Sequence, residues 1–181
     1  GGAQAKYDVR PDITCFGKVI GGGLPIGAIG GSRAVMENLS PLGKVFHAGT
    51  LAGNPLATAA GLSALNELTQ DVYMELGARA RQLATLLRDA CTSAGITAQF
   101  PVVGTLVGAF FGNRVPTNFD EAKQTDEKMY AKFFHAMLDE GVAMAPGAYE
   151  ALFVGVGHTD AVMEQLALAA HRAAHAVAAA K

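Results

Sequence analysis

The sequence predicts a mixed α/β fold in which one long helix separates two parts of different character. Through residue 70, short apolar runs alternate with glycine-rich turns and one helical pattern. From Asp71 to Gly95, apolar residues recur every three or four positions, the spacing of one face of an amphipathic helix. Beyond Gly95, strand and helix patterns are mixed, which is typical of a small α+β domain. We therefore expect three segments, at residues 1–70, 71–95 and 96–181.

Composition excludes several classes of protein. Half of the 181 residues are hydrophobic and 17% are charged, which is ordinary for a globular chain. A net charge of -2 without a basic stripe argues against nucleic acid as a partner. No apolar run has the length of a bilayer-spanning helix, and the first residues lack the layout of a signal peptide. The two cysteines form no disulfide framework or zinc pattern, so we expect no metal and a cytoplasmic (or plastid) location.

Two N-cap signals mark helix starts in the first part. Ser32 can cap a short helix, because its hydroxyl can accept a hydrogen bond from a free backbone N–H group. Asn54 can cap a longer one, and Pro55 suits the first helical position because no N–H is needed there. The other elements expected here are a loop at residues 1–12, a buried strand at 13–16, a strand at 26–29, a loop at 40–54, and helix ends near Glu37 and Leu68.

In the second part, acidic caps and glycines delimit three helices. Asp71 is expected to cap the long helix and Gly95 to end it. Asp120 opens the next helix and Gly141 stops it, and either Thr159 or Asp160 caps the last one. Strands are expected at residues 96–100, 106–111, 142–144 and 152–156. Inward positions of the last helix are expected at Val162, Leu166, Ala169, Ala173 and Val177.

Lys18 is the only charged residue in the run 14–27, and three glycines follow it almost at once. A lysine in apolar surroundings is more readily neutral, and a neutral amine is what Schiff-base formation with an aldehyde requires. The glycines would allow backbone to approach a flat ligand closely. A lysine before a glycine-rich turn is also typical of an ordinary solvated loop, so the spacing alone leaves both interpretations open.

Two segments resemble the class III (subgroup II) aminotransferases. Residues 11–28, PDITCFGKVIGGGLPIGA, are similar to the segment that carries the cofactor lysine of this family, and residues 47–57, HAGTLAGNPLA, to a second family signature. The resemblance implies the fold of fold-type I enzymes and the cofactor pyridoxal 5′-phosphate (PLP), with pyridoxamine 5′-phosphate as the second form in the cycle. It runs over nearly the whole chain.

The resemblance implies roles for four residues. Lys18 would hold the cofactor and move protons during the reaction, as catalytic and cofactor-binding residue. Gly49 and Thr50 would reach the cofactor phosphate of a neighbouring subunit, which implies a homodimer with sites at the interface. Glu150 matches a family glutamate near the substrate. Without the resemblance, Thr50 is an ordinary turn residue and Glu150 an exposed loop residue.

The position of Lys18 within the first twenty residues suggests a partial chain. In the family the cofactor lysine lies well inside a longer chain, after the other cofactor contacts. We therefore interpret residues 1–70 as the carboxy-terminal part of a large PLP-binding domain, residues 71–95 as a connecting helix and residues 96–181 as a small carboxy-terminal domain.

Three functions remain open. Residues 1–5, 49–51 and 150–153 favour the aminomutase branch of the family, which implies conversion of glutamate 1-semialdehyde to 5-aminolevulinate for tetrapyrrole synthesis. The alternative is an ω- or β-amino acid aminotransferase, because residues 147–149 and 154–157 depart from the aminomutase pattern on the substrate side. The third is a piece without activity that serves only in folding or dimerisation. The glycine run 21–27 matches neither a dinucleotide fingerprint nor a P-loop.

Overall fold

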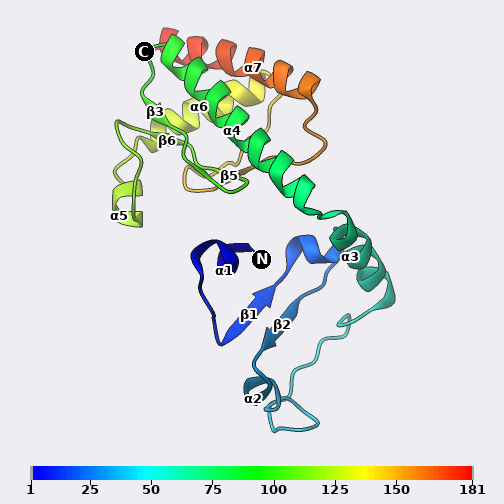
Figure 1. Cartoon of the computed structure of the whole chain (residues 1–181). Helices are drawn as coiled ribbons and strands as arrows, with labels where there is room; N and C mark the ends of the chain where they lie inside the picture. Colours follow the sequence, from blue (N-terminus) through cyan, green and yellow to red (C-terminus); the bar gives the residue numbers. More distant parts are fainter. Residues whose placement is uncertain (1, 181) are drawn as a thin grey trace. The chain divides into compact units, whose positions relative to one another are not determined.

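The computed structural model describes residues 2–180, and its contacts divide the chain into two units, Gly1–Thr69 and Gln70–Lys181. Figure 1 labels the helices and strands of both units. The first unit contains a two-stranded sheet, a 3₁₀ turn and helices α1 to α3. The second unit contains helices α4 to α7 and the remaining strands.

The sheet of the first unit is an antiparallel pair. Strand β1 (Ile13–Phe16) pairs with β2 (Ala28–Gly31), and Phe16 lies opposite Ala28. The strand predicted at residues 13–16 is confirmed, whereas the one predicted at 26–29 begins two residues later, because pairing with the end of β1 decides where β2 starts. The prediction that β1 is buried is wrong for the described chain, since Ile13 and Phe16 are 52% and 53% exposed.

Helix starts in the first unit follow their caps. The Asn54 side chain accepts a hydrogen bond from the Ala57 N–H at 2.9 Å and begins α3 (Pro55–Glu67). The Ser32 hydroxyl does the same for Val35 at 3.4 Å at the start of α2 (Arg33–Met36). The loop predicted at residues 1–12 is wrong over α1 (Gly2–Tyr7), because Gln, Ala and Lys favour a helical turn despite the neighbouring glycines.

Three helices form the frame of the second unit: α4 (Gln70–Ser93), α6 (Glu127–Asp139) and α7 (Asp160–Ala179), with the short α5 (Phe119–Ala122) before α6. Arg79 contacts Asp160 and Ser93 contacts His175, so α4 and α7 run side by side in the same direction. Figure 1 shows this pairing. The long helix predicted at residues 71–95 and the last helix predicted from Thr159 or Asp160 are confirmed as α4 and α7.

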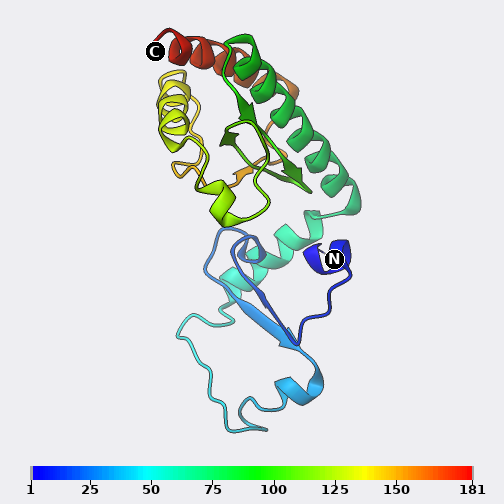
Figure 2. The same ribbon diagram turned by 90° about the vertical axis from the view of Figure 1, so that its left-hand side faces the viewer.

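The strands of the second unit are only two residues long. Strand β3 (Ala98–Gln99) pairs with β6 (Phe110–Phe111), and the order of the other sheet is β4 (Val102–Val103), β5 (Leu106–Val107), β7 (Leu152–Phe153). Figure 2 shows these strands flanked by α4 and α6. The strand predicted at residues 106–111 is split in two, the one at 142–144 is wrong, and β4 was not predicted. Such short strands are decided by pairing between distant residues rather than by local pattern.

Two predicted helix starts in the second unit are wrong, and a third, left open between two residues, is decided. Asp71 lies inside the first turn of α4 instead of capping it. Asn118 caps α5 and Asp126 caps α6, each accepting from the N–H three residues on, so the helix expected from Asp120 is two helices. Of the two candidates for α7, Thr159 is the cap.

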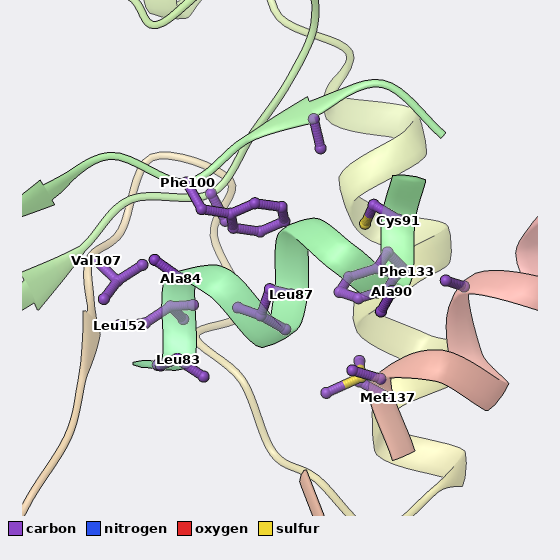
Figure 3. Close-up of a cluster of buried hydrophobic side chains, with 14 of the residues drawn as sticks. Leu83, Ala84, Leu87, Ala90, Cys91, Phe100, Val107, Phe133, Met137 and Leu152 are labelled. Carbon is purple, nitrogen blue, oxygen red and sulfur yellow. The ribbon is translucent and has the colours of Figure 1, made fainter. Parts of the chain in front are cut away.

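The core of the second unit lies where α4, α6 and α7 meet the strands. Leu87, Phe100, Phe133 and Met137 are at most 2% exposed, and Figure 3 shows them clustered with Cys91. The stripe predicted on α4 supplies much of this cluster. On α7 the prediction for Val162 is wrong: that residue is 38% exposed, and neighbouring residues supply the inward face. The buried residues of α7 are Met163, Ala169, Ala170, Ala173, Ala174 and Val177.

Candidate active site

Lys18 occupies a backbone conformation that is rare for a residue with a side chain. It is separated from β1 by Gly17 and begins the 3₁₀ turn η1 (Lys18–Gly21), with φ at 54°. For L-residues other than glycine this left-handed region is disfavoured by roughly 1–2 kcal/mol. Strain of this kind persists only where the surroundings hold it, and it is concentrated at functional sites. The Lys18 side chain is exposed, so the apolar surroundings expected from the sequence are not supplied by the described residues.

Helix α3 holds the lysine turn in place through two glycines. A Cβ at Gly61 of α3 would overlap the Ile20 carbonyl oxygen, and a Cβ at Gly22 would lie 2.5 Å from the Ala60 carbonyl oxygen. Gly22 also has φ at +57°, so two separate reasons exclude a side chain there. The backbone of the turn therefore rests directly on the backbone of α3, which leaves little room for Lys18 to adopt a relaxed conformation.

A groove of about 520 Å³ lies between the antiparallel pair β1–β2 and the loop before α3. It brings together the two segments on which the family resemblance rests, and Gly49 lies in its wall. Thr50 is the next residue, is exposed, and has no hydrogen-bonding partner for its hydroxyl among residues 2–180. The lining residues are Cys15, Phe16, Pro25, Ile26, Gly27, Ala28, Ile29, His47, Ala48, Gly49, Leu51 and Ala52.

Two consecutive turns shape the loop that carries Gly49 and Thr50. The Ala52 N–H donates to the Gly49 carbonyl at 2.9 Å, and the Asn54 side-chain amide donates to the Leu51 carbonyl at 2.9 Å. Asn54 therefore caps α3 with its oxygen and holds the loop with its nitrogen. These bonds occupy carbonyl groups and leave the Thr50 hydroxyl available to an acceptor or donor from outside.

Glu150 belongs to the second unit and is turned back on its own loop. Its carboxylate accepts a hydrogen bond from the Gly147 N–H at 2.9 Å, and a Cβ at Gly147 would lie 2.5 Å from the same oxygen. Glu150 lines a groove of about 410 Å³ together with Ala145, Leu152 and His158. Burial and, to a smaller extent, the negative charge of Glu150 raise the pKa of Tyr130, whose hydroxyl donates to the Ala145 carbonyl.

The residues that hold the turn before Glu150 could not be predicted from the sequence pattern. Tyr130 on α6 donates to the turn, and Tyr149 in the turn donates back to Glu127 on α6. Nothing in the sequence marks either tyrosine as part of a bond between α6 and the turn, because each bond joins residues well separated along the chain. Among residues 2–180, no group of three or more metal-ligating side chains is assembled, and none of the helices combines the length and apolar character needed to cross a bilayer.

A scan against family models matches residues 2–169 to aminotransferase class III. The chain belongs to the class III aminotransferase family. This membership accounts for the resemblance of both signature segments, which the structure brings together around one groove. It also agrees with the expected fold-type I architecture, since solved structures of the same family superpose well on this chain.

Three proteins illustrate how class III relatives compare with this chain. It is 50% identical over 161 residues to glutamate-1-semialdehyde 2,1-aminomutase of Desulfosudis oleivorans, covering 88% of this chain and 38% of that protein. An omega-transaminase from Sphaerobacter thermophilus is 29% identical to this chain and superposes on it with a TM-score of 0.82. The match covers 96% of this chain and 41% of the transaminase chain. A glutamate-1-semialdehyde aminomutase from Pseudomonas aeruginosa PAO1 in complex with PMP is 24% identical and has the same fold, with a TM-score of 0.79. The match covers 95% of this chain and 40% of the aminomutase chain.

Proposed function

We propose that this chain carries the cofactor lysine of a PLP-dependent class III enzyme and that Lys18 is that residue. The observation that carries the proposal is the groove that joins residues 15–29 with residues 47–52, the two segments that resemble the signatures of the family. The chain spans about 38% of the aminomutase relative, so the activity proposed is that of an enzyme of which these residues form a part. In it, residues 1–70 would belong to the large domain, residues 71–95 to a connecting helix and residues 96–181 to the small domain.

Lys18 and Thr50 belong to the two segments that form the groove, although neither is among its lining residues, and their side chains fit a phosphorylated aldehyde. Lys18 offers an exposed primary amine, the group that condenses with an aldehyde. Thr50 offers a hydroxyl without an internal partner among the described residues, in a loop whose Gly49 can approach a phosphate closely. Bound PLP supplies an electron sink that makes the proton on the amino-bearing carbon of the substrate removable.

Lys18 would then act as the proton carrier. Once its amine is free, Nζ can take a proton from a carbon of the substrate and return it to a neighbouring atom, a task that needs a base positioned within hydrogen-bonding reach. The left-handed backbone of Lys18, held by α3, supports this role because it restricts the direction in which the side chain leaves the turn. Glu150 is proposed as a substrate-side carboxylate that attracts the amino groups of the substrate.

The reaction proposed is the intramolecular transfer of an amino group that converts glutamate 1-semialdehyde to 5-aminolevulinate, for tetrapyrrole synthesis. Its support is the 50% identity to an aminomutase over 161 residues. The second candidate is a two-substrate transaminase, supported by the likeness to the omega-transaminase at 29% identity. An assay without any added keto acid distinguishes them, because only the aminomutase completes its reaction without a second substrate.

A homodimer is proposed because the loop that carries Thr50 exposes large apolar side chains. Leu42 and Phe46 are 79% and 80% exposed, and Leu51 is 60% exposed. Exposed apolar groups gathered on one loop favour coverage by another protein surface, and a second copy of the enzyme would bring Thr50 to its neighbour's cofactor phosphate.

The test is borohydride reduction of the purified protein with PLP, followed by peptide mapping. We expect one phosphopyridoxyl group on Lys18, its loss in Lys18→Ala, and its persistence in the matched control Lys44→Ala. Thr50→Val should reduce PLP retention. Labelling scattered over Lys6, Lys44 and other lysines would contradict the role of Lys18 in this chain and favour a piece that serves only in folding or dimerisation.

A further inference from the structure

Two histidines lie one turn apart on the exposed side of α7. His171 and His175 have ring centroids 4.4 Å apart, with an angle of 39° between the ring planes. Both side chains are exposed. Residues four apart on a helix project from the same face, and two imidazoles at this spacing can direct one nitrogen each to a shared metal ion. The pair belongs to the second unit, and none of the residues proposed for the PLP site is part of it.

A contact with Ser93 of α4 favours one tautomer of His175. The Ser93 hydroxyl donates its proton to the Ala90 carbonyl at 2.8 Å, so toward His175 Nε2, 3.3 Å away, its oxygen acts as an acceptor. With the hydrogens assigned in this way, Nε2 of His175 carries the hydrogen and Nδ1 keeps the lone pair that a metal needs. Metal-binding histidines commonly have their second nitrogen held in this way by an outer partner, which orients the ring.

The charge beside the pair is compensated. Arg172, which stands between the two histidines in sequence, donates from Nε to the Glu140 carboxylate at 2.6 Å. The positive charge of Arg172 is therefore paired with the carboxylate of Glu140, at the end of α6, and repels an approaching cation less. No third metal-ligating side chain completes the set among residues 2–180, so water or an outside ligand would fill the other coordination positions.

We propose that His171 and His175 form a two-nitrogen chelate for a divalent late transition metal. Neutral imidazole suits Cu²⁺, Ni²⁺ and Zn²⁺, and the general affinity order places Cu²⁺ above Ni²⁺ and Zn²⁺. Binding requires both rings to be unprotonated, so protons compete with the metal for the ring nitrogens. A metal held by two residues of one helical turn would also stabilise the carboxy-terminal half of α7.

The test uses the purified whole chain without an affinity tag and measures Cu²⁺ and Ni²⁺ binding by calorimetry. We expect one Cu²⁺ site per chain and weaker Ni²⁺ binding. His171→Gln and His175→Gln should each weaken Cu²⁺ binding about tenfold or more, because each leaves a single ligand and removes the chelate. His135→Gln is the matched control, since His135 is an exposed histidine of α6 outside the pair, and it should bind as the wild type does.

Electron paramagnetic resonance of the Cu²⁺ complex provides the second readout. The wild type should show two nitrogen ligands and each single variant only one, while circular dichroism checks that the variants keep their helices. Cu²⁺ binding that is unchanged in both single variants, or that is lost in His135→Gln, would overturn the proposal. Neither measurement depends on PLP, so its outcome is separate from that of the lysine labelling.

Discussion

The Tyr149 hydroxyl donates a hydrogen bond to the Glu127 carboxylate and thereby ties the turn before Glu150 to the first turn of α6. The ring of Phe119 packs edge-on against Tyr149 at 5.5 Å between centroids. From the other direction Tyr130 of α6 donates to Ala145. Helix α6 therefore holds this turn through hydrogen bonds at both of its ends.

The hydrogen bond between Tyr149 and Glu127 predicts how Tyr149 titrates. The hydrogen bond to Glu127 raises the pKa of Tyr149, with smaller contributions from burial and from the negative charge of Glu127. A raised pKa means that the folded chain prefers neutral tyrosine. The stabilisation is thus fully present below the ordinary tyrosine pKa of about 10 and is lost as the pH rises through the folded-state pKa.

Glu127→Gln should therefore shift part of the tyrosine ionisation to lower pH, measured by phenolate absorbance. Tyr149→Phe should remove the same component from the curve. Glu164→Gln, which changes an exposed glutamate of α7, is the control and should leave the titration unchanged. Because a Gln carbonyl can still accept a hydrogen bond, Glu127→Ala is the stricter variant, and a Glu127→Ala curve that coincides with that of the wild type would contradict the bond.

Lys18→Gly is expected to make the chain more stable while it abolishes cofactor labelling. Glycine tolerates the φ of 54°, and the relief of strain exceeds the added entropy of the unfolded chain by about 0.5–1 kcal/mol. Asp8→Gly is the matched control, because Asp8 has φ at 50° and no proposed role.

Both glycine variants should raise the denaturant midpoint by similar amounts, and only Lys18→Gly should lose the phosphopyridoxyl group. A loss of stability in Lys18→Gly alone would mean that its side chain stabilises the turn more than its backbone strains it.

Gly61→Ala should weaken the first unit and disturb the lysine turn. Its Cβ would meet the Ile20 carbonyl, a backbone group that cannot rotate away, and such overpacking costs about 1–3 kcal/mol. Gly17→Ala is the control, since no atom lies within 4 Å of the added Cβ and its φ of -163° suits any residue. Denaturant unfolding measures the first effect and lysine labelling with PLP the second. Equal stability of the two variants would contradict the close contact between α3 and η1.

The two cysteines should differ in reactivity toward an alkylating reagent. Cys91 is buried in the core, and that burial raises its pKa to about 12, whereas Cys15 is exposed at the groove. The thiolate is the reactive form, so the folded chain should take up one label, on Cys15, and the denatured chain two. Bound PLP should slow the labelling of Cys15 if the groove is the cofactor site. Rapid labelling of Cys91 in the folded chain would indicate that the α4 core opens readily.

Local signals allowed the helices to be predicted better than the strands. Asn54 and Pro55 marked the start of α3, and the apolar stripe of α4 matched its buried face, because capping and helical period act within a few residues. The strands after Gly95 were misplaced since each pairs over only two residues, and a distant partner decides which residues those are. For the candidate site, the identities of Lys18, Gly49, Thr50 and Glu150 came from resemblance to a family, and they stay proposals.

The family, the long helices α3, α4 and α7, and the places of a lysine and a threonine in signature segments could be read from the amino-acid sequence alone, since these depend on residues that are neighbours along the chain. Three features became visible only in the folded chain: Lys18 adopts a left-handed backbone, α3 contacts its turn through Gly61, and both signature segments line one groove. Those features arise from contacts between backbone groups far apart in the chain, and such contacts leave no periodic pattern in the sequence.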